Sequence, residues 1–479
     1  MNYSIIRYIL GWVLNFEACF LTLPCMTALI YKEREGFAFL AVLVLCLVFG
    51  MLLTSRKPKN DTFYTKEGFV TVSLSWIVMS IMGALPFVLN GDIPSFTDAL
   101  FETISGFTTT GASILTDVEA LARCSLFWRS FTHWIGGMGV FVFLLAVLPM
   151  TGGSTMNLMR AESPGPSVGK LVPKIRQTAM LLYGIYFFMT VVEIILLIAG
   201  GMPVFDSLTH AFGTAGTGGF GVRNTSIGGY SDYLINVITV FMILFGVNFN
   251  VYYLIFAKKW KKAFSCEEVR WYLIIIAAAV GVITVNIRGM YESVGQALKH
   301  AAFQVASIIT TTGFSTTDFD LWPQLSRTIL VLLMFIGACA GSTGGGIKVS
   351  RVVILVKTIK KELDSFVHPR SVKKIHVEGR PIEHETLRSV NVFMIAYLVV
   401  FSVSVLLVTL DGFDLVTNFT AVAATFNNIG PGLSKVGPTM NFSEFSGLSK
   451  YVLMFDMLAG RLEIFPMLLC FYPSTWRKF

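Results

Sequence analysis

The stretch Thr310-Thr311-Thr312-Gly313-Phe314 decides the predicted fold because it recurs along the chain. Thr108-Thr109-Thr110-Gly111-Ala112 repeats it nearly letter for letter. Two looser copies are Gly216-Thr217-Gly218-Gly219-Phe220 and Asn427-Asn428-Ile429-Gly430-Pro431. The copies recur at intervals of roughly 100 residues, and such a period is typical of a repeated structural unit. We therefore predict that the chain contains four copies of one unit.

Each copy has similar sequence surroundings. A short, partly apolar run precedes it, and a polar stretch followed by a full-length apolar segment comes after it. A membrane-spanning helix needs about 20 apolar residues, so the short run is predicted to enter the membrane and turn back. The predicted unit is a helix, a short helix with a re-entrant pore loop, and a second helix. Four such loops can surround one axis.

The composition indicates a membrane protein. The chain is 54% hydrophobic and 14% charged, with a mean hydropathy of +0.68. This balance excludes an ordinary soluble domain and favours an all-helical protein that crosses the bilayer many times. The seven cysteines form no CxxC pair and mostly lie in apolar runs, so we expect core residues rather than disulfides or a metal site. The first apolar run is expected to be a retained helix, not a signal peptide.

Positive charges cluster in every second loop between the expected spans, so that one face is consistently basic. By the positive-inside rule this face is cytoplasmic. The clusters lie against membrane segments without interleaved aromatic residues, which argues against nucleic-acid binding. They occupy residues 56–66, 160–176, 258–262, 348–388 and 477–478.

Ten spans are expected, two in an N-terminal pair and two in each repeat, with both termini in the cytoplasm. The expected divisions are an N-terminal helix pair at 1–66 and pore repeats at 67–176, 177–266, 267–385 and 386–479. Asp98 and Asp206 lie early in their short runs and suit helix N-caps. The expected spanning helices are 5–31, 37–54, 69–90, 126–149, 178–200, 232–257, 271–287, one from 327 onward, 389–410 and 450–471.

The Thr and Gly residues of the loops suit the binding of a dehydrated cation. Non-helical backbone at membrane depth must be buried in protein or line a water-filled path. Backbone carbonyls that point at an axis can replace the water shell of a cation, and glycine permits the required backbone angles. The short helix before each loop directs its partially negative carbonyl end toward the ion. Ordinary loop chemistry is the alternative for any single copy.

Several stretches resemble the Trk/Ktr/HKT superfamily of potassium transporters over essentially the whole chain. Besides the four loops, the matches are Trp134-Ile135-Gly136-Gly137-Met138-Gly139, Arg160-Ala161-Glu162-x-Pro164-Gly165-Pro166, residues 341–348 and residues 460–465. The two additional N-terminal helices make the chain most similar to the bacterial TrkH/TrkG branch.

This resemblance implies a channel-like pore subunit for potassium uptake across the bacterial inner membrane. The implied filter contains the two residues before each key glycine and the glycine itself. It comprises Thr109, Thr110, Gly111, Thr217, Gly218, Gly219, Thr311, Thr312, Gly313, Asn428, Ile429 and Gly430. Glycine at all four key positions implies potassium as the ion, whereas the second loop, with Gly216-Thr217-Gly218, departs most from the family pattern.

The family also implies a homodimer and a cytosolic TrkA- or KtrA-like nucleotide-binding ring. The chain itself has neither a GxxxxGK[ST] nor a strand-linked GxGxxG motif.

A glycine-rich stretch interrupts the expected outgoing helix of the third repeat. Five glycines fall between Gly337 and Lys348, and each costs roughly 1 kcal/mol in a helix relative to alanine. We expect a broken helix whose loop crosses the pore below the filter, and the family resemblance implies that this loop is a gate. A tight helix crossing is the alternative, and Lys348 could equally be an anchor at the inner face. The expected gate residues are Gly341, Ser342, Thr343, Gly344, Gly345, Gly346, Lys348 and Arg461.

Arg461 lies in the last apolar run, where a cation is expensive unless it is paired or faces water. The resemblance puts it beneath the filter, and an interhelical salt bridge is the alternative, although Glu463 is not an obvious partner.

Two histidines and two rival functions remain. His133 and His210 are expected to be packing residues or helix-capping residues. We find no convergent acid–base or metal set that would indicate a membrane enzyme. An alternating-access symporter for potassium with protons or sodium is the closer rival. Only one strongly broken helix is expected, which favours a continuous pore.

Overall fold

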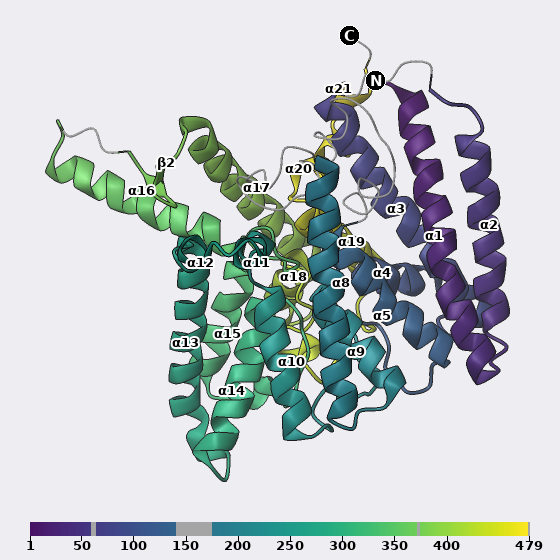
Figure 1. Ribbon diagram of the computed structural model, residues 1–479, viewed down its shortest axis with the longest axis horizontal. Helices are drawn as coiled ribbons and strands as arrows, with labels where there is room; N and C mark the ends of the chain where they lie inside the picture. Colours follow the sequence, from purple (N-terminus) through teal and green to yellow (C-terminus); the bar gives the residue numbers. More distant parts are fainter. Residues whose placement is uncertain (59–63, 140–174, 371–373, 478–479) are drawn as a thin grey trace.

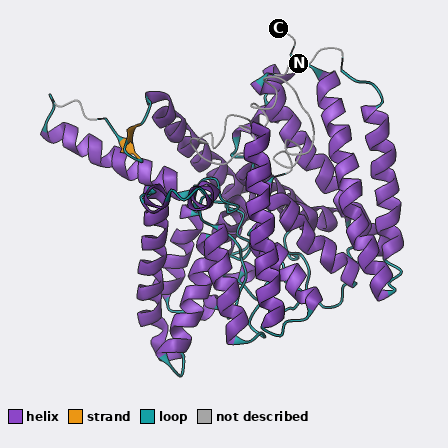
Figure 2. Cartoon of the chain, in the orientation of Figure 1, coloured by secondary structure: helices purple, strands orange, loops and turns teal. Residues whose placement is uncertain are grey.

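The computed structural model describes residues 1–58, 64–139, 175–370 and 374–477. Within them the chain is a helical bundle, and its two termini lie at the same end (Figure 1). One element departs from the all-helical expectation. It is a short antiparallel hairpin of β1 (His376–Val377) and β2 (Arg380–Pro381), drawn in orange in Figure 2.

Three long helices begin the chain: α1 (Tyr3–Tyr31), α2 (Gly36–Thr54) and α3 (Thr65–Asn90). Both N-terminal helices match the sequence prediction to within two residues. On α2 the apolar side chains mostly face outward, and Phe37 is 75% exposed. Such a face is stable only against lipid, which agrees with a membrane-embedded position at the edge of the bundle (Figure 1).

The rest of the chain contains four short helices, each preceded by a long helix and followed by a loop and an outgoing helix. The short helices are α4 (Phe96–Phe107), α9 (Val204–Gly216), α14 (Val294–Ile309) and α18 (Leu415–Phe426). The long helices before them are α3, α8 (Ile175–Ala199), α13 (Glu267–Ile287) and α17 (His384–Val408). The outgoing helices begin as α5 (Arg123–Met138), α10 (Asp232–Phe245), α15 (Gln324–Ile336) and α19 (Gly447–Arg461).

The expectation of a single strongly broken helix is wrong. The helix expected at 232–257 is α10 followed by α11 (Phe249–Phe256), with a bend of 91° between them. Asn248 makes this break, because its side chain accepts from the N–H of Asn250 and caps α11. The helix expected at 450–471 is also interrupted, between α19 and α20 (Phe465–Phe471), where Glu463 and Ile464 have positive φ. Residues 140–149 of the helix expected at 126–149 lie outside the described residues.

The expected N-caps of two short helices are also wrong. Helix α4 is capped by Ser95 and α9 starts after Pro203, so Asp98 and Asp206 lie in the first turns instead. The chain enters each helix three residues earlier than predicted. A carboxylate in the first turn still lies near the positive end of the helix dipole, so the electrostatic part of the argument holds.

Six of the described helices are long and apolar enough to span a membrane, or seven segments if α10 and α11 form one bent span. The described helices α15 and α19 are too short to qualify, and the continuation of the segment that begins with α5 lies outside the described residues. The count of ten spans stays a prediction. All seven cysteines are free, but only Cys46, Cys124 and Cys339 are buried, so the core expectation is correct for three of them.

Two elements leave the bundle near the break of α10. The short α12 (Trp260–Phe264) follows α11, and α16 (Val349–Val367) extends outward at a steep angle to α15 (Figure 1). The β1–β2 hairpin lies beside α16. The interruption predicted in the third outgoing helix is therefore present, and residues 337–348 between α15 and α16 are not helical. A plain helix crossing at this stretch is ruled out.

Candidate functional site

The four short helices end in the same hydrogen-bonding pattern. At the end of α4, the N–H of Thr109 donates to Gly106 O (3.1 Å) and the N–H of Thr110 donates to Ser105 O (2.9 Å). This pair of bonds is a Schellman-type C-cap, which turns the chain sharply away from the helix axis. The other three copies repeat both bonds, each from a backbone N–H to a carbonyl oxygen. At the end of α9 they join Thr217 to Thr214 and Gly218 to Gly213; at the end of α14, Thr311 to Ile308 and Thr312 to Ser307; and at the end of α18, Asn428 to Thr425 and Ile429 to Ala424.

Each loop also repeats two left-handed backbone positions. The first is a non-glycine residue: Thr109, Thr217, Thr311 and Asn428 have φ between 55° and 59°. A β-branched residue in this region is strained by about 1–3 kcal/mol and persists only where its surroundings hold it. The second is the key glycine, with φ of 78° at Gly111, 80° at Gly219, 82° at Gly313 and 97° at Gly430. The repeated angles turn each loop in the same way.

The key glycines join the four loops into a closed ring. A β-carbon built on Gly111 would lie 1.9 Å from the carbonyl oxygen of Gly218 in the second loop. The relationship continues from Gly219 to Thr312 O (2.0 Å), from Gly313 to Ile429 O (2.1 Å), and from Gly430 back to Thr110 O (2.7 Å). Each glycine thus makes room for the carbonyl group that precedes the next glycine. Only a residue without a side chain fits at these four positions.

The backbone oxygens before the glycines are buried without a hydrogen bond. Thr109, Thr110, Thr217, Gly218, Thr311, Thr312, Asn428 and Ile429 are all buried. Within the described part of the chain, none of their carbonyl oxygens accepts a hydrogen bond. Buried carbonyls without partners are unfavourable unless water or an ion satisfies them. The four of these oxygens that meet the key glycines form one ring, which is a suitable environment for a dehydrated monovalent cation.

Side chains of the loops link them to their supports. The hydroxyl groups of Thr108 and Thr110 lie 2.8 Å apart, and Thr310 and Thr312 repeat this distance in the third loop. The Asn428 amide donates to the Thr110 hydroxyl (2.9 Å) and to the carbonyl of Met457 on α19 (2.9 Å). No group of three or more His, Cys, Asp or Glu side chains with metal-binding geometry occurs among the described residues. Any cation in this ring would therefore be held by carbonyl and hydroxyl oxygens.

A buried ion pair that the sequence reasoning missed supports the outer ends of the first two loops. The Arg129 side chain lies 2.5 Å from Glu102, and both groups are almost fully buried. Glu102 accepts from the N–H of Ile114, and Arg129 donates to the carbonyl of Gly221. A buried pair with this many hydrogen bonds fixes the relative position of the two loops. The signal in the sequence was a charged residue in the middle of each helix, Glu102 in α4 and Arg129 in α5.

His133 has a more specific role than the packing or capping that was expected. Its Nε2 accepts from the N–H of Phe220 (3.3 Å), so this nitrogen is unprotonated. Its Nδ1 lies 2.8 Å from the carbonyl oxygen of Gly106 and is therefore the donor. Neutral His133 on α5 thus bridges the end of α4 and the second loop.

The 337–348 segment lies directly against the ring. The N–H of Gly345 donates to the Thr311 hydroxyl (2.6 Å), and a β-carbon on Gly345 would lie 2.4 Å from Asn427 O. Gly337, Gly341 and Gly346 have φ between 70° and 76°, which gives the segment a folded course that L side chains disfavour. The segment is therefore in van der Waals contact with the third and fourth loops.

Lys348 closes this segment on itself. The residue is buried, its φ is 81°, and its ammonium group donates to the carbonyl of Gly344. An anchor at the inner membrane face would instead extend its ammonium group to water. The structure therefore favours a role for Lys348 within the segment.

Arg461 connects the 337–348 segment to the first loop. Its guanidinium donates to the Thr109 hydroxyl (3.1 Å), the Thr343 carbonyl (2.8 Å), the Gly136 carbonyl (2.5 Å) and the Gly137 carbonyl (2.8 Å). Glu463, as expected, is not its partner, because Glu463 pairs with Arg351, which lies over the Phe393 ring. One cationic side chain therefore contacts the first loop, α5 and the segment together.

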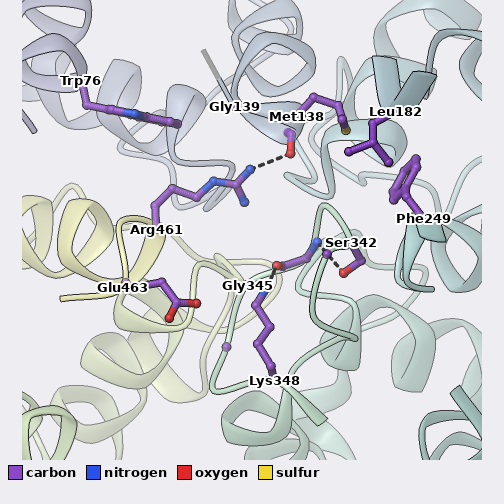
Figure 3. A pocket seen from close by; sticks show the side chains of 15 residues that line it. Trp76, Met138, Gly139, Leu182, Phe249, Ser342, Gly345, Lys348, Arg461 and Glu463 are labelled. Atoms are coloured by element: carbon purple, nitrogen blue, oxygen red, sulfur yellow. Dashed lines mark hydrogen bonds between the residues drawn. The ribbon is translucent and has the colours of Figure 1, made fainter. Parts of the chain in front are cut away.

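Cavities lie on both sides of the ring. One, of about 160 Å³, is lined by the four key glycines together with the loops that follow them. The other, of about 80 Å³, is lined by Gly344, Gly345, Lys348, Arg461 and Glu463 among others. In Figure 3 the Arg461 and Lys348 side chains approach this second cavity from α19 and from the 337–348 segment, respectively. The ring and the segment therefore separate two small spaces that are large enough for water.

The expected filter residues and gate residues are thus brought together in space, including members more than 300 residues apart in sequence. Of the stretches that carry the family resemblance, Arg160–Pro166 lies outside the described residues. The basic cluster at 160–176 lies almost entirely outside them as well.

Comparison with known proteins identifies the family. Residues 35–478 match the family model described as "TrkH: Cation transport protein". The chain is 37% identical to the Trk system potassium uptake protein TrkH of Salmonella typhimurium over the full length of both chains. It is 33% identical to TrkG of Escherichia coli, again over both full lengths. The crystal structure of the potassium transporter TrkH from Vibrio parahaemolyticus superposes with a TM-score of 0.89 at 34% identity, covering both chains completely. The chain is therefore a multi-pass membrane transport protein, not an enzyme, and belongs to the TrkH family of cation transport proteins.

Proposed function

We propose that the chain is the pore subunit of a potassium uptake system in a bacterial inner membrane, and that the ring of four loops is its selectivity filter. The single observation that supports this proposal best is the cyclic contact of the four key glycines with the carbonyl groups of the next loop. A closed ring of buried, unpartnered oxygens favours an ion that can shed its water and be surrounded on all sides. The full-length relatives are named as potassium uptake proteins.

The proposed gate is the 337–348 segment. In this proposal the segment lies at the inner end of the filter, and its contact with Thr311 and its link to Arg461 support this placement. A cation that passes the ring toward the cavity of about 80 Å³ meets the fixed charges of Arg461 and Lys348. Both the segment and these charges must therefore move or be screened before an ion can pass.

An alternating-access symporter is the second candidate, and the additional breaks in the outgoing helices favour it more than the sequence suggested. The continuous ring of carbonyls argues for a filter, because a carrier does not need four equivalent loops around one axis. Control by a cytosolic nucleotide-binding ring of the TrkA or KtrA kind, a homodimeric assembly and cytoplasmic termini belong to the same proposal.

Flux measurements in liposomes test the proposal. Purified protein without any partner should transport potassium and rubidium down their gradients and discriminate against sodium. The rate should rise with concentration well beyond the range in which a carrier saturates. Saturation at low concentration, with a fixed stoichiometry of protons or sodium per potassium ion, would instead identify a symporter. Equal fluxes of potassium and sodium would contradict the filter assignment.

A further inference from the structure

A carboxylate outside the ring and the segment holds the proposed gate in place. Glu268 lies in the first turn of α13 and is almost fully buried. Its Oε1 accepts from the backbone N–H of Ala340 (2.6 Å) and from that of Ser350 (3.2 Å). Ala340 belongs to the 337–348 segment and Ser350 to the first turn of α16. One oxygen atom therefore ties the middle of the segment to the helix that follows it.

The same side of the segment is held by the break between α10 and α11. The N–H of Cys339 donates to Gly246 O (3.1 Å), and the N–H of Phe249 donates to Gly341 O (3.0 Å). The Asn248 amide, which lies between them, reaches the second oxygen of Glu268 at 3.5 Å. The segment is thus attached to α10 and α11 through backbone groups, and to α13 through the Glu268 carboxylate.

The start of α13 is in turn attached to the β1–β2 hairpin. Glu378, in the turn of the hairpin, accepts from the backbone N–H of Glu267 (2.7 Å) and of Glu268 (3.5 Å). These are the free N–H groups of the first turn of α13, so Glu378 caps this helix from a distant part of the chain. Lys357 of α16 pairs with Glu267 (2.5 Å) and donates to the carbonyl of His376 on β1 (2.7 Å).

We propose that Glu268 is a positioning residue for the 337–348 segment, and that the hairpin bearing Glu378 controls it through the start of α13. The physical argument is the strength and placement of the contacts. Hydrogen bonds to a charged acceptor are about twice as strong as neutral ones, and this acceptor binds both Ala340 and Ser350. A displacement of the hairpin removes the cap from α13 and shifts Glu268, which loosens its hold on Ala340. The proposal rests on the gate assignment made above.

Rubidium uptake and the reactivity of Cys339 test this inference together. Cys339 precedes Ala340 and is completely buried, so its alkylation, followed by peptide mass spectrometry, reports the position of the segment without any flux measurement. Glu268→Gln keeps the shape of the side chain but removes its charge. It should raise both basal rubidium flux and Cys339 alkylation about tenfold, the change expected when a hydrogen bond to a charged group is weakened. The ratio of potassium to sodium flux should not change.

The link to the hairpin is tested with a double mutant. Glu378→Gln should produce the same two changes to a smaller degree, and Glu268→Gln/Glu378→Gln should resemble Glu268→Gln alone, because both act through one carboxylate. The matched control is Glu385→Gln, which alters an exposed carboxylate in the first turn of α17. Its flux and alkylation should match those of the parent.

The outcomes separate this inference from the proposed function. If the parent protein shows no selective potassium flux, the proposed function is wrong, whatever the variants do. If the parent conducts but Glu268→Gln leaves Cys339 protected and basal flux unchanged, Glu268 does not position the segment. A stable Glu268→Gln variant with lower flux contradicts the inference as well. Fully additive effects of the two substitutions would mean that the hairpin acts by another route.

Discussion

The hydroxyl oxygen of Thr311 accepts a hydrogen bond from the backbone N–H of Gly345 at 2.6 Å. Thr311 is the left-handed residue of the third loop, and Gly345 belongs to the glycine run near the end of the 337–348 segment. The proposed filter and the proposed gate are therefore joined by a direct hydrogen bond. A movement of the segment therefore changes the surroundings of a strained residue in the ring.

Substitution of a key glycine should reduce ion selectivity. In Gly111→Ser, the new β-carbon would lie 1.9 Å from the Gly218 carbonyl, which must move away from its position in the ring. We expect the ratio of potassium to sodium flux to fall about tenfold, which corresponds to roughly 1.4 kcal/mol of discrimination. Gly313→Ser should act in the same way. The control is Gly91→Ser, because Gly91 has a similar φ of 82° with no atom within 4 Å. Unchanged ion ratios in both ring variants would remove the filter assignment.

A substitution confined to the segment should change conduction but not selectivity. Gly346 has a φ of 76°, and its β-carbon would lie 2.7 Å from Gly337 at the other end of the segment. Gly346→Ala should therefore distort the segment, with about 1–2 kcal/mol of backbone strain, and change the maximal rubidium flux at an unchanged ion ratio. Replacement of Gly344–Gly346 together should have a larger effect. Gly281→Ala on α13, where nothing lies within 4 Å, is the control. Parent-like flux in Gly346→Ala would indicate a packing role for the segment.

Removal of the Arg461 charge should increase flux. A unit charge 4 Å from a permeating cation repels it by roughly 4 kcal/mol at an effective dielectric constant of 20. Arg461→Ala also frees the Thr343 carbonyl, so uptake per mole of purified, monodisperse protein should rise about tenfold or more. Arg461→Lys should retain most of the barrier, because it keeps the charge while losing the fork geometry. Arg288→Ala, at an exposed position, is the control. A stable Arg461→Ala protein with lower flux would contradict this role.

The thiol of Cys266 should report the surroundings of the hairpin through its pH dependence. Burial, together with the carboxylates of Glu378 and Glu268, raises the pKa of Cys266 to about 12. Since only the thiolate reacts, alkylation at pH 8 should be slow and should rise about tenfold per pH unit below that pKa. Glu378→Gln removes a negative charge, so the pKa should fall and the rate at fixed pH should increase. The same peptide in denatured protein is the reference. Equal rates in folded and denatured protein would show that the surroundings of Cys266 do not raise its pKa.

Much of the fold could be read from the sequence, because it depends on local chemistry. Apolar runs near twenty residues become helices wherever they occur, so α1, α2, α8 and α13 begin and end within four residues of their predicted bounds. The four loops were recognisable because glycine is required at one position of each, and the repetition remained visible. The five glycines of the 337–348 segment likewise predicted a break.

The two additional helix breaks were not predicted from the sequence, for two different reasons. Residues 462–464 are Leu-Glu-Ile, yet Glu463 and Ile464 adopt positive φ, and Glu463 reaches Arg351 more than 100 residues away. At the break after α10, Gly246, Asn248 and Asn250 interrupt the apolar run, and this local signal was missed. At residues 462–464, by contrast, a contact with a distant element outweighs the small free-energy preference for a continuous helix.

The sequence by itself determined that this chain is a membrane bundle with four equivalent loops and one glycine-rich interruption. Only the tertiary structure decided that the loops form a closed ring and that Arg461 joins the first loop to the segment. It also showed that Glu268 accepts hydrogen bonds from the backbone of Ala340 and Ser350. The physical reason is that each of these relationships has a backbone group as at least one of its partners. Every residue type offers the same N–H and C=O groups, so their partners are chosen by the packing of the whole chain.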